Sequence, residues 1–572
     1  MSELMEWGSD AVAAVVRELG FEYIALVPGS SFAGLHDSFV NYLHEDPPLL
    51  VCLHEEHAVG IAHGYARVTG KPMLAVLHSN VGLMHATMAF FSAWCDRMPA
   101  VVIGANGPLD ARQRRPWIDW IHSARDPAAM IRHYTKWDDM PASVEAAVDS
   151  VIRATQLAST LPMGPTYVVV DMTDQDRELT APVALPDKRR FAPPELPGPM
   201  PADVERVLEF VRAAKRPVLA IGRCSRDVSA WNARIALAEA LGARVITDFK
   251  VGGSFPTDHP LHVGLTAVRL MNEQLEAVRS ADLIIGLECV DLGGMLKRAF
   301  GTGPIAARIV NVSLDRYVTN GWSFDHQAQP PADLDLAVAH ERLVPALLAA
   351  LEPVARPPVP ARKPAAAPAE EGVMGMRAFA AILEAEFAGI EHSYSRLPLG
   401  YNEGAPFAFR HPLEYLGGDG GAGVGIGPSL AIGAALALRG SGRLSVGVLG
   451  DGDYLMGVQA IWTAVKYEIP LLLVVANNRC YYNDVIAGEA MALRRRRPVE
   501  NKWIAQMIDD PAPDLAALAR AQGAQAIGPV VDAPSLREAL RRGIEAVRAG
   551  NVFVIDAIVD PELDRRAAAT AS

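Results

Sequence analysis

The chain has 572 residues, a length that predicts roughly three domains. Hydrophobic residues make up 50% of it and charged residues 21%, which is typical of a well-buried globular enzyme and excludes an intrinsically disordered chain. The formal net charge of −13 argues against a nucleic-acid partner.

No apolar run approaches membrane-spanning length, so no membrane partner is expected. The first residues, MSELMEWGSD, lack a basic stretch that leads into an apolar one, and no signal peptide is predicted. The five cysteines show no CxxC or other metal-ligand spacing. We therefore expect reduced thiols in a cytoplasmic protein.

The first part of the chain alternates helical patterns with short runs of β-forming residues. Helices are predicted over residues 11–19 and 56–68. Buried strands are predicted over residues 23–27, 49–53, 73–77, 100–103 and 167–170. Because strands that alternate with helices form mainly parallel sheets, we expect an α/β domain over residues 1–180.

Two proline-rich stretches divide the rest of the chain. Residues 181–201 separate the first domain from a second α/β unit, which is expected over residues 202–351. Its predicted strands are residues 217–221, 244–246, 282–286 and 309–312. Residues 352–369 are lower in complexity and are expected to form a stiff, extended linker before a third domain over residues 374–572.

The third domain contains the most informative stretch, residues 446–484. It consists of an apolar run, the sequence Gly450-Asp451-Gly452, apolar residues at helical spacing, and a second apolar run that ends at a double asparagine. This order is half of a doubly wound sheet, which places Asp451 and Asn478 at the same ligand-binding edge. The predicted fold class is therefore α/β, with three doubly wound parallel-sheet domains.

Asp451 and Asn478 offer oxygen ligands at that edge. With a nearby main-chain carbonyl they suit Mg²⁺ or Ca²⁺, and Mg²⁺ commonly takes further ligands from phosphate oxygens. The glycines allow the backbone to approach a diphosphate closely. A tight turn and a simple strand terminator are the alternative interpretation.

The whole arrangement resembles the diphosphate- and metal-binding motif of thiamine diphosphate (ThDP) enzymes, which begins with GDG and ends with a double asparagine. The resemblance implies that ThDP and Mg²⁺ bind here. It implies Asp451, Asn478 and the main-chain carbonyl of Cys480 as metal ligands, and it places Gly450 and Gly452 beside the diphosphate.

Glu55 follows a predicted strand and opens a helix, with an inward-facing carboxylate expected. A buried carboxyl group needs a specific partner because desolvation disfavours its charge, whereas a helix-dipole interaction is the bland alternative. The segment HEEHAVGIAHGYARVTGKP is similar to the ThDP-enzyme segment in which a glutamate precedes Gly-Tyr-Ala-Arg. The similarity implies that Glu55, not Glu56, bonds the pyrimidine ring of ThDP and promotes the imino tautomer that generates the ylide.

Residues 416–436, LGGDGGAGVGIGPSLAIGAAL, form a glycine-rich loop that leads into a helix of small residues. The amides at such a helix start suit a diphosphate, although close helix packing is the alternative. In the family pattern Val424, between Gly423 and Gly425, takes the position that wedges ThDP into its bent shape. Valine is smaller than the residue usually found there.

Ser30 and His78 end two further predicted strands, within the segments VPGS and LHS. Without the resemblance, turn and capping roles are the simpler interpretation. Both segments match those of benzoylformate decarboxylases, which implies that Ser30 and His78 are active-site residues and that the histidine transfers protons. The loop after His78 departs from the Gly-Pro-Gly version of acetolactate synthases, which weakens that alternative.

Trp117 and Trp120 lie in the segment RRPWIDWIH. They are candidates for a substrate pocket and equally for the core or an interface.

The resemblance implies a pyrimidine-binding, a central and a diphosphate-binding domain, and an active site between subunits. A homodimer is then the minimum assembly and a homotetramer is expected. The implied reaction is non-oxidative decarboxylation of a small 2-oxo acid, with an aryl acid as one candidate and aldehyde carboligation as a side reaction. Two alternatives stay open: a carboligase or 2-hydroxyketone lyase, such as a benzaldehyde lyase or an acetolactate synthase-like enzyme, and a non-catalytic ThDP-fold binding subunit.

Overall fold

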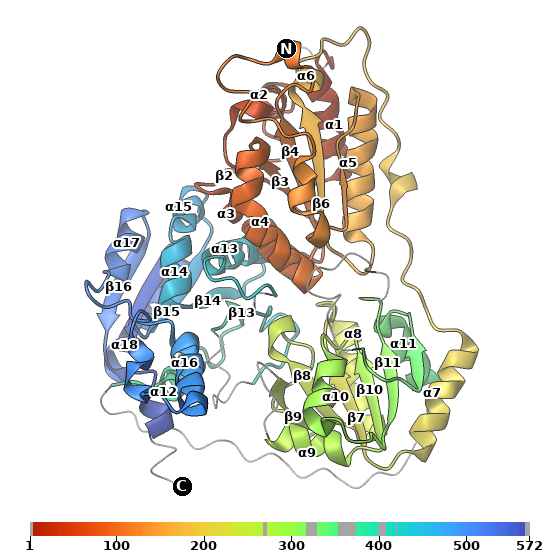
Figure 1. Ribbon diagram of the computed structural model, residues 1–572, viewed down its shortest axis with the longest axis vertical. Coiled ribbons are helices and arrows are strands. Elements are labelled where there is room, and N and C mark those ends of the chain that lie inside the picture. The colour runs from red at the N-terminus through yellow and green to blue at the C-terminus, as the bar shows by residue number, and fades with distance from the viewer. Residues whose placement is uncertain are drawn as a thin grey trace.

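The computed structural model describes residues 4–266, 272–315, 318, 329–352, 373–398, 408–418 and 420–566. It contains three α/β units, each built on one all-parallel sheet (Figure 1). The prediction of an α/β fold with three parallel-sheet domains is therefore confirmed. The expected linker after residue 352 lies outside the described residues.

The N-terminal unit has a six-stranded sheet in the order β2-β1-β3-β4-β6-β5. Its strands are β1 (Ile24–Leu26), β2 (Leu49–Val51), β3 (Leu74–Leu77), β4 (Ala100–Asn106), β5 (Trp137–Asp139) and β6 (Pro165–Asp171). Its main helices are α1 (Gly8–Leu19), α3 (Glu55–Thr69), α4 (Ser79–Asp96) and α5 (Val144–Ser159). Strands β3, β4 and β6 are buried along their whole length, as expected of interior strands in a parallel sheet covered on both faces.

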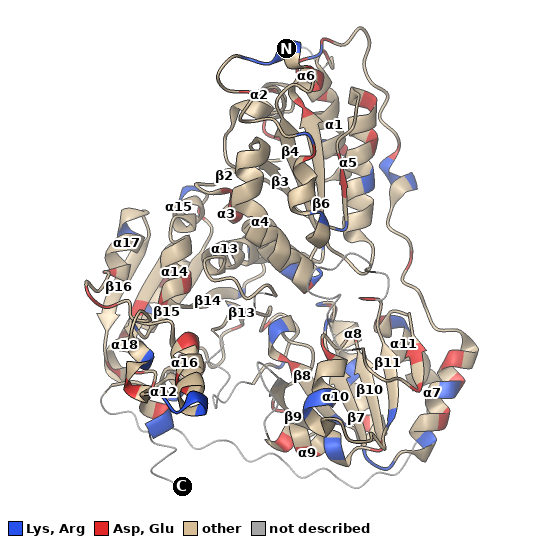
Figure 2. Ribbon diagram, viewed as in Figure 1, with Lys and Arg blue, Asp and Glu red and all other residues tan. Residues whose placement is uncertain are grey.

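The central unit has its six strands in the order β12-β11-β10-β7-β8-β9. They are β7 (Pro217–Ile221), β8 (Arg244–Asp248), β9 (His262–Thr266), β10 (Leu283–Leu287), β11 (Arg308–Val312) and β12 (Leu334–Leu336). The helices α7 (Pro201–Ala213), α8 (Val228–Leu241), α9 (Asn272–Ser280), α10 (Leu292–Phe300) and α11 (His340–Ala350) surround this sheet (Figure 1). Acidic and basic side chains are mixed along the outer helix α7 (Figure 2).

The C-terminal unit has a five-stranded sheet in the order β13-β14-β15-β17-β16. Its strands are β13 (His392–Arg396), β14 (Leu444–Gly450), β15 (Leu471–Asn477), β16 (Gln525–Val530) and β17 (Val552–Ile558). Its helices are α12 (Met376–Glu386), α13 (Gly427–Leu438), α14 (Asp451–Gly457), α15 (Ala460–Lys466), α16 (Tyr482–Arg495), α17 (Leu515–Ala521) and α18 (Ala533–Arg548). Within the described residues, no helix is both long and apolar enough to cross a lipid bilayer.

The connection between β14 and β15 differs from the predicted single helix, because it consists of the two short helices α14 and α15. Gly457 ends the first of them. A Cβ atom at Gly457 would lie only 2.2 Å from the carbonyl oxygen of Gly425, so the helix needs a glycine where it meets the glycine-rich loop. Glycine weakens a helix, which is consistent with the break that follows.

The N-terminal and C-terminal units meet where α3 packs against α13 (Figure 1). Glycines bring the two backbones together: a Cβ at Gly64 would lie 2.1 Å from the Leu430 carbonyl oxygen, and one at Gly433 would lie 2.0 Å from that of Ile61. The small residues of α13 thus serve close helix packing, the alternative raised by the sequence. The loop before α13 remains the candidate for ligand binding.

Arg67, the arginine of the Gly-Tyr-Ala-Arg segment, ties the two units together at the far end of α3. Its buried guanidinium pairs with Asp96 and donates to the main-chain carbonyls of Gly417 and Gly418. Burial opposes ionisation of Asp96, but Arg67 and His63 outweigh burial and hold the pKa of Asp96 well below its usual range. An intact buried charge pair of this kind fixes the position of the glycine-rich loop.

Arg226 joins all three units. Its guanidinium donates to the carbonyl oxygens of Arg67 in the N-terminal unit, Gly253 in the central unit and Leu416 in the C-terminal unit. The position of the N-terminal unit relative to the C-terminal unit therefore depends in part on Arg226, a side chain of the central unit.

Candidate active site

Asp451 follows β14 at the carboxyl edge of the C-terminal sheet and begins α14. Its side chain is buried, with Oδ1 accepting the Gly452 amide at 2.8 Å and Oδ2 without a partner among the described residues. Burial raises the pKa of Asp451 to about 6, although the amides of Gly452, Arg479 and Cys480 oppose the shift. An unpaired buried carboxylate oxygen is costly and is satisfied when a cation binds it.

The loop after β15 lies beside this carboxylate. The side-chain oxygen of Asn478 accepts the Cys480 amide at 3.1 Å, and Arg479 between them adopts a left-handed φ of 57°. The amides of Arg479 and Cys480 act on the Asp451 carboxylate, so this loop lies next to Asp451 at the carboxyl edge of the sheet. The preceding Asn477 instead donates to Asp556 at 2.9 Å inside the sheet, so only one residue of the double asparagine is free to bind a ligand.

The thiol of Cys480 is not suited to metal binding. Burial raises its pKa to about 12, with a contribution from Asp451, so the sulfur stays protonated near neutral pH. This leaves its main-chain carbonyl as the candidate ligand atom.

The glycine-rich loop is held by Asp453, a residue that the sequence analysis did not single out. Its Oδ1 accepts the amides of Gly425 and Gly427 at 2.7 and 3.1 Å, while its other oxygen pairs with Arg396. Val424, next to Gly425, is about half exposed at 47%. Asp453 therefore shapes the loop, and the side chain of Val424 stays available for contact with a ligand.

Gly423 precedes Val424 and packs against α4 of the N-terminal unit. A Cβ there would lie 2.5 Å from the methyl carbon of Met88. The loop therefore lies between the C-terminal sheet and the N-terminal unit.

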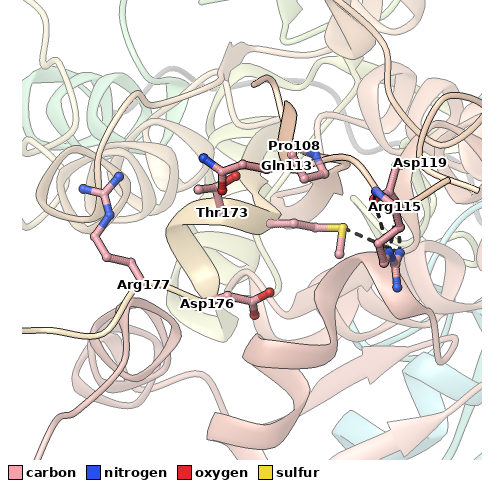
Figure 3. A pocket seen from close by; sticks show the side chains of 8 residues that line it. Pro108, Gln113, Arg115, Asp119, Thr173, Asp176 and Arg177 are labelled. Atoms are coloured by element: carbon pink, nitrogen blue, oxygen red, sulfur yellow. Dashed lines mark hydrogen bonds and ion pairs between the residues drawn. The ribbon is translucent and has the colours of Figure 1, made fainter. Parts of the chain in front are cut away.

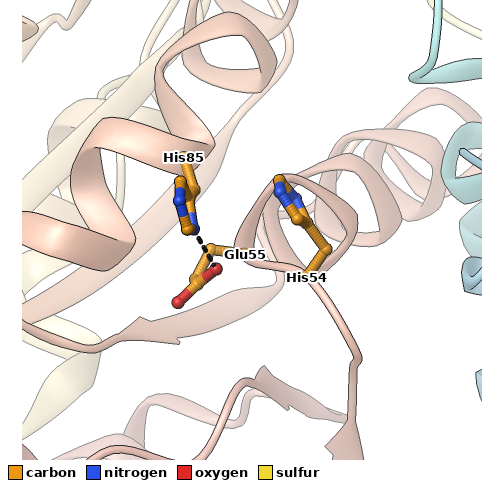
Figure 4. A group of neighbouring side chains, drawn as sticks. All are labelled: His54, Glu55 and His85. Carbon is orange, nitrogen blue, oxygen red and sulfur yellow. Dashed lines mark hydrogen bonds and ion pairs between the residues drawn. The ribbon is translucent and has the colours of Figure 1, made fainter. Parts of the chain in front are cut away.

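Glu55 is the first residue of α3 and is 7% exposed. Its Oε2 lies 2.9 Å from Nδ1 of His85 on α4 (Figure 4). The neighbouring Glu56 is less buried, and burial raises its pKa, with a contribution from Asp453. Glu55 is buried, as the sequence predicts, and its charge acts on His78 at the same edge of the N-terminal sheet.

His78 follows β3 and is the N-cap residue of α4. Its Nδ1 forms a 2.8 Å hydrogen bond with the hydroxyl of Ser31, which also accepts the amide of Ser79 at 3.1 Å. Ser30, the predicted serine, lies exposed beside this pair, and Gly29 packs against the His78 ring. The serine that contacts His78 is thus Ser31, the second serine of the segment PGSS.

A second histidine faces His78. The ring of His122 lies 4.6 Å from that of His78, close to perpendicular at 73°. Burial lowers the pKa of His78 and His122 lowers it further, while the charge of Glu55 acts in the opposite direction. His78 is therefore a neutral imidazole near neutral pH and can accept a proton.

The segment before His122 carries both tryptophans on the surface. Trp117 is 89% exposed and Trp120 is 69% exposed, which excludes the core interpretation for this chain. The substrate-pocket and interface interpretations remain.

A cavity of about 320 Å³ lies at the carboxyl ends of β4 and β6, next to this segment (Figure 3). Arg115 lines it and pairs with Asp119 at 2.8 Å, and Arg177 pairs with Asp174 at 2.6 Å. Burial raises the pKa of Asp176, which also lines the cavity. Both guanidinium groups already have carboxylate partners, so the cavity is not arranged as a simple anion site.

Among the described residues, Glu55 and His78 form no hydrogen bond with Asp451, Asn478 or Val424. The N-terminal and C-terminal units contact each other mainly through α3 and α13, with further contacts between Met88 and Gly423 and between Val51 and Tyr467.

Comparison with known protein families shows which family this chain belongs to. Three sequence families match in chain order: "Thiamine pyrophosphate enzyme, N-terminal TPP binding domain" over residues 6–130, the "central domain" over residues 204–319, and the "C-terminal TPP binding domain" over residues 401–557. This chain is a thiamine diphosphate enzyme. Thiamine pyrophosphate is another name for ThDP, and each matched segment contains most strands of one of the three parallel sheets.

Relatives of this ThDP enzyme extend over its whole length. It is 25% identical to a benzoylformate decarboxylase of Pseudomonas aeruginosa, over 96% of this chain and 98% of the relative. It is 22% identical to a probable acetolactate synthase large subunit of Methanocaldococcus jannaschii, over 97% and 92%. The solved structure of a 4-hydroxybenzoylformate decarboxylase from Rhodococcus jostii RHA1 superposes with a TM-score of 0.77 at 21% identity, covering 97% of this chain and 99% of that one, which shows a shared fold.

The residues at the carboxyl edge of the C-terminal sheet fit the ThDP diphosphate and its cation. The unpaired Asp451 oxygen, the Asn478 amide and the Cys480 carbonyl are oxygen donors of the kind that Mg²⁺ takes. Bound ThDP supplies a nucleophilic carbon that attacks a carbonyl group and then accepts the resulting charge. Recognition, orientation and proton transfer are left to the side chains of this ThDP enzyme.

Proposed function

We propose that this ThDP enzyme is a Mg²⁺-dependent, non-oxidative decarboxylase of a small 2-oxo acid, with aldehyde carboligation as a side reaction. The observation that carries the proposal is His78, whose Nδ1 is held by Ser31 and whose Nε2 is thereby left for a substrate beside Glu55. The full-length similarity to a benzoylformate decarboxylase supports the same reaction class.

In this proposal, residues of the C-terminal unit bind the cofactor. Asp451, Asn478 and the Cys480 carbonyl hold Mg²⁺, and Val424 supports the bent cofactor. Gly423, Gly425, Gly450 and Gly452 let the backbone approach it.

Residues of the N-terminal unit act on the reacting atoms of ThDP and the substrate. Glu55 bonds the pyrimidine ring, His78 moves protons to and from the substrate, and the exposed Ser30 contacts the substrate carboxylate. The exposed tryptophans Trp117 and Trp120, on the segment that ends at His122, favour an aryl or other bulky 2-oxo acid over a small aliphatic one.

His78→Ala is expected to lower turnover by roughly 10²–10⁴, the usual effect of removing a positioned acid–base group. The melting temperature and the ThDP affinity should barely change, because His78 is a partly exposed strand-end residue. The measurement is turnover on the best substrate from a panel of aryl and aliphatic 2-oxo acids, set against thermal stability. A stable His78→Ala protein with near-normal turnover would remove His78 from the mechanism and with it the support for decarboxylation.

We further propose that Glu55 of one subunit meets the Asp451 loop of a second, so that a homodimer is the smallest active unit. Coexpression of Glu55→Gln and Asp451→Ala chains tests this arrangement. Each variant alone should be inactive, whereas a mixed dimer has one site with both changes and one intact site. An equal mixture is then expected to recover about a quarter of wild-type activity, and no recovery would place each complete site within one chain.

A carboligase is the second candidate, because the acetolactate synthase relative also matches nearly the whole chain. A carboligase would join two carbonyl compounds from the same panel without net aldehyde release. The product analysis therefore distinguishes the two reactions.

A further inference from the structure

Helix α4 presents three residues of one face to Glu55. His78 occupies the N-cap position, Gly82 follows one turn later and His85 a further turn on. The side chain of His85 points at the Glu55 carboxylate (Figure 4), with Nδ1 at 2.9 Å from Oε2. Glu55 thus lies against a helix that also carries the proton-transfer residue.

The two oxygens of Glu55 have different surroundings. Oε2 is engaged by His85, whereas Oε1 makes no hydrogen bond among the described residues and faces Gly82. A Cβ built at Gly82 would lie 3.3 Å from Oε1 and 3.1 Å from Cγ, so glycine leaves space for the carboxylate. One oxygen is therefore fixed and the other is left for a ligand.

The ring of His85 is itself held in place. It stacks on the ring of His54 at 5.0 Å with an interplanar angle of 20°. His54 in turn caps α3, because its Nδ1 accepts the Glu56 amide at 3.2 Å. The start of α3 thus orients the plane of His85, although the side chain of His85 is 52% exposed.

His54, Glu55 and His85 also place three potential metal-ligand atoms within 4.8 Å of one another. The hydrogen bond to the Glu56 amide argues against a metal at this point. Since Nδ1 of His54 is the acceptor, the neutral ring carries its proton on Nε2 and has no second lone pair to offer.

We propose that His85 is a positioning residue for Glu55. Nδ1–H of His85 donates to Oε2, and this hydrogen bond turns Oε1 toward the pyrimidine ring nitrogen of ThDP. A hydrogen bond to a carboxylate is stronger than one between neutral groups, so it can hold a side chain at the surface of a cleft. The inference rests on the proposed role of Glu55 and adds the residue that orients it.

The test is exchange of the ThDP thiazolium proton, followed by NMR on the Mg²⁺- and ThDP-loaded protein without substrate. His85→Leu is expected to slow exchange about 10- to 100-fold, the cost of misplacing a reacting group by about 1 Å. The ThDP dissociation constant should stay unchanged, because the C-terminal unit holds the diphosphate. His85→Asn keeps an N–H donor and should recover most of the rate, while His133→Leu, at an exposed histidine of the same unit, should change nothing.

A double-mutant cycle separates positioning from a structural role. In the Glu55→Gln background, His85→Leu should cause no further loss, since His85 acts only through the carboxylate. If the two substitutions instead lower the exchange rate additively, and the melting temperature also falls, the proposal is overturned. A crystal structure of His85→Leu gives a readout independent of activity: the Glu55 carboxylate should leave its wild-type orientation, and an unchanged carboxylate would contradict the inference.

The exchange rates of the two single variants distinguish a failure of the His85 role from a failure of the proposed role of Glu55. If Glu55→Gln slows exchange and His85→Leu does not, the role of His85 fails while the ThDP site stands. If Glu55→Gln itself leaves exchange unchanged, both fail.

Discussion

Glu55→Gln is expected to leave ThDP bound and to slow exchange of its thiazolium proton by roughly 10²–10⁴. The amide is close in shape to the carboxylate but lacks its charge, so it cannot favour the protonated ring nitrogen. Each ~1.4 kcal/mol of lost stabilisation costs about a factor of ten in rate. The measurement is proton exchange by NMR, alongside ThDP affinity by calorimetry.

Glu56→Gln is the matched control. The two glutamates are neighbours at the start of α3, but among the described residues only Glu55 forms a hydrogen bond with His85. Exchange in Glu56→Gln should stay close to the wild-type rate. Normal exchange in Glu55→Gln together with slow exchange in Glu56→Gln would transfer the role to Glu56.

Asp451→Ala is expected to abolish Mg²⁺-dependent ThDP binding while the protein stays folded. Oδ1 of this side chain accepts the adjacent Gly452 amide, and Oδ2 has no partner among the described residues, so the substitution removes few contacts. Calorimetry of ThDP binding with and without Mg²⁺ measures the effect, and the melting temperature of the cofactor-free protein reports the fold. Undiminished ThDP affinity in Asp451→Ala would exclude this metal site.

The pKa of Asp451 predicts a pH dependence for the same binding step. Because burial raises this pKa to about 6 in the cofactor-free protein, the side chain is charged above that pH and protonated below it. A cation binds the charged form, so affinity should fall about tenfold per pH unit below that value. In Asp451→Ala this dependence should be absent.

The raised pKa of Asp451 also makes the folded cofactor-free protein less stable as the pH rises, whereas cation binding becomes stronger. A carboxyl group whose folded pKa is raised stabilises the protein below its unfolded value of 3.8, and this contribution is lost as the pH rises through about 6. The cofactor-free Asp451→Ala protein should therefore be at least as stable as wild type at pH 8.

Apolar runs predicted the interior strands because interior strands are buried on both faces. β3, β7, β14 and β15 all lie within or close to the expected ranges. Of the six edge strands only β2 was predicted; β5, β9, β12, β13 and β16 were not, since an edge strand packs less of its surface and need not be apolar. β17 is an interior apolar strand that the sequence analysis also did not cover.

The sequence predicted which strand ends hold the candidate site residues, because the position of a strand end depends on the order of the strands alone. It brought Asp451 and Asn478 to one edge and Glu55 and His78 to another. It could not identify the partners Ser31, His85 and His122, because these contacts depend on how side chains point across the gap between separate elements.

The most direct test of the central claim is product analysis of the ThDP- and Mg²⁺-loaded protein with a panel of 2-oxo acids. The expected result is release of carbon dioxide and the matching aldehyde from at least one acid, dependent on added ThDP and lost in Glu55→Gln. Carboligation of aldehydes with no carbon dioxide released from any 2-oxo acid would contradict the decarboxylase assignment.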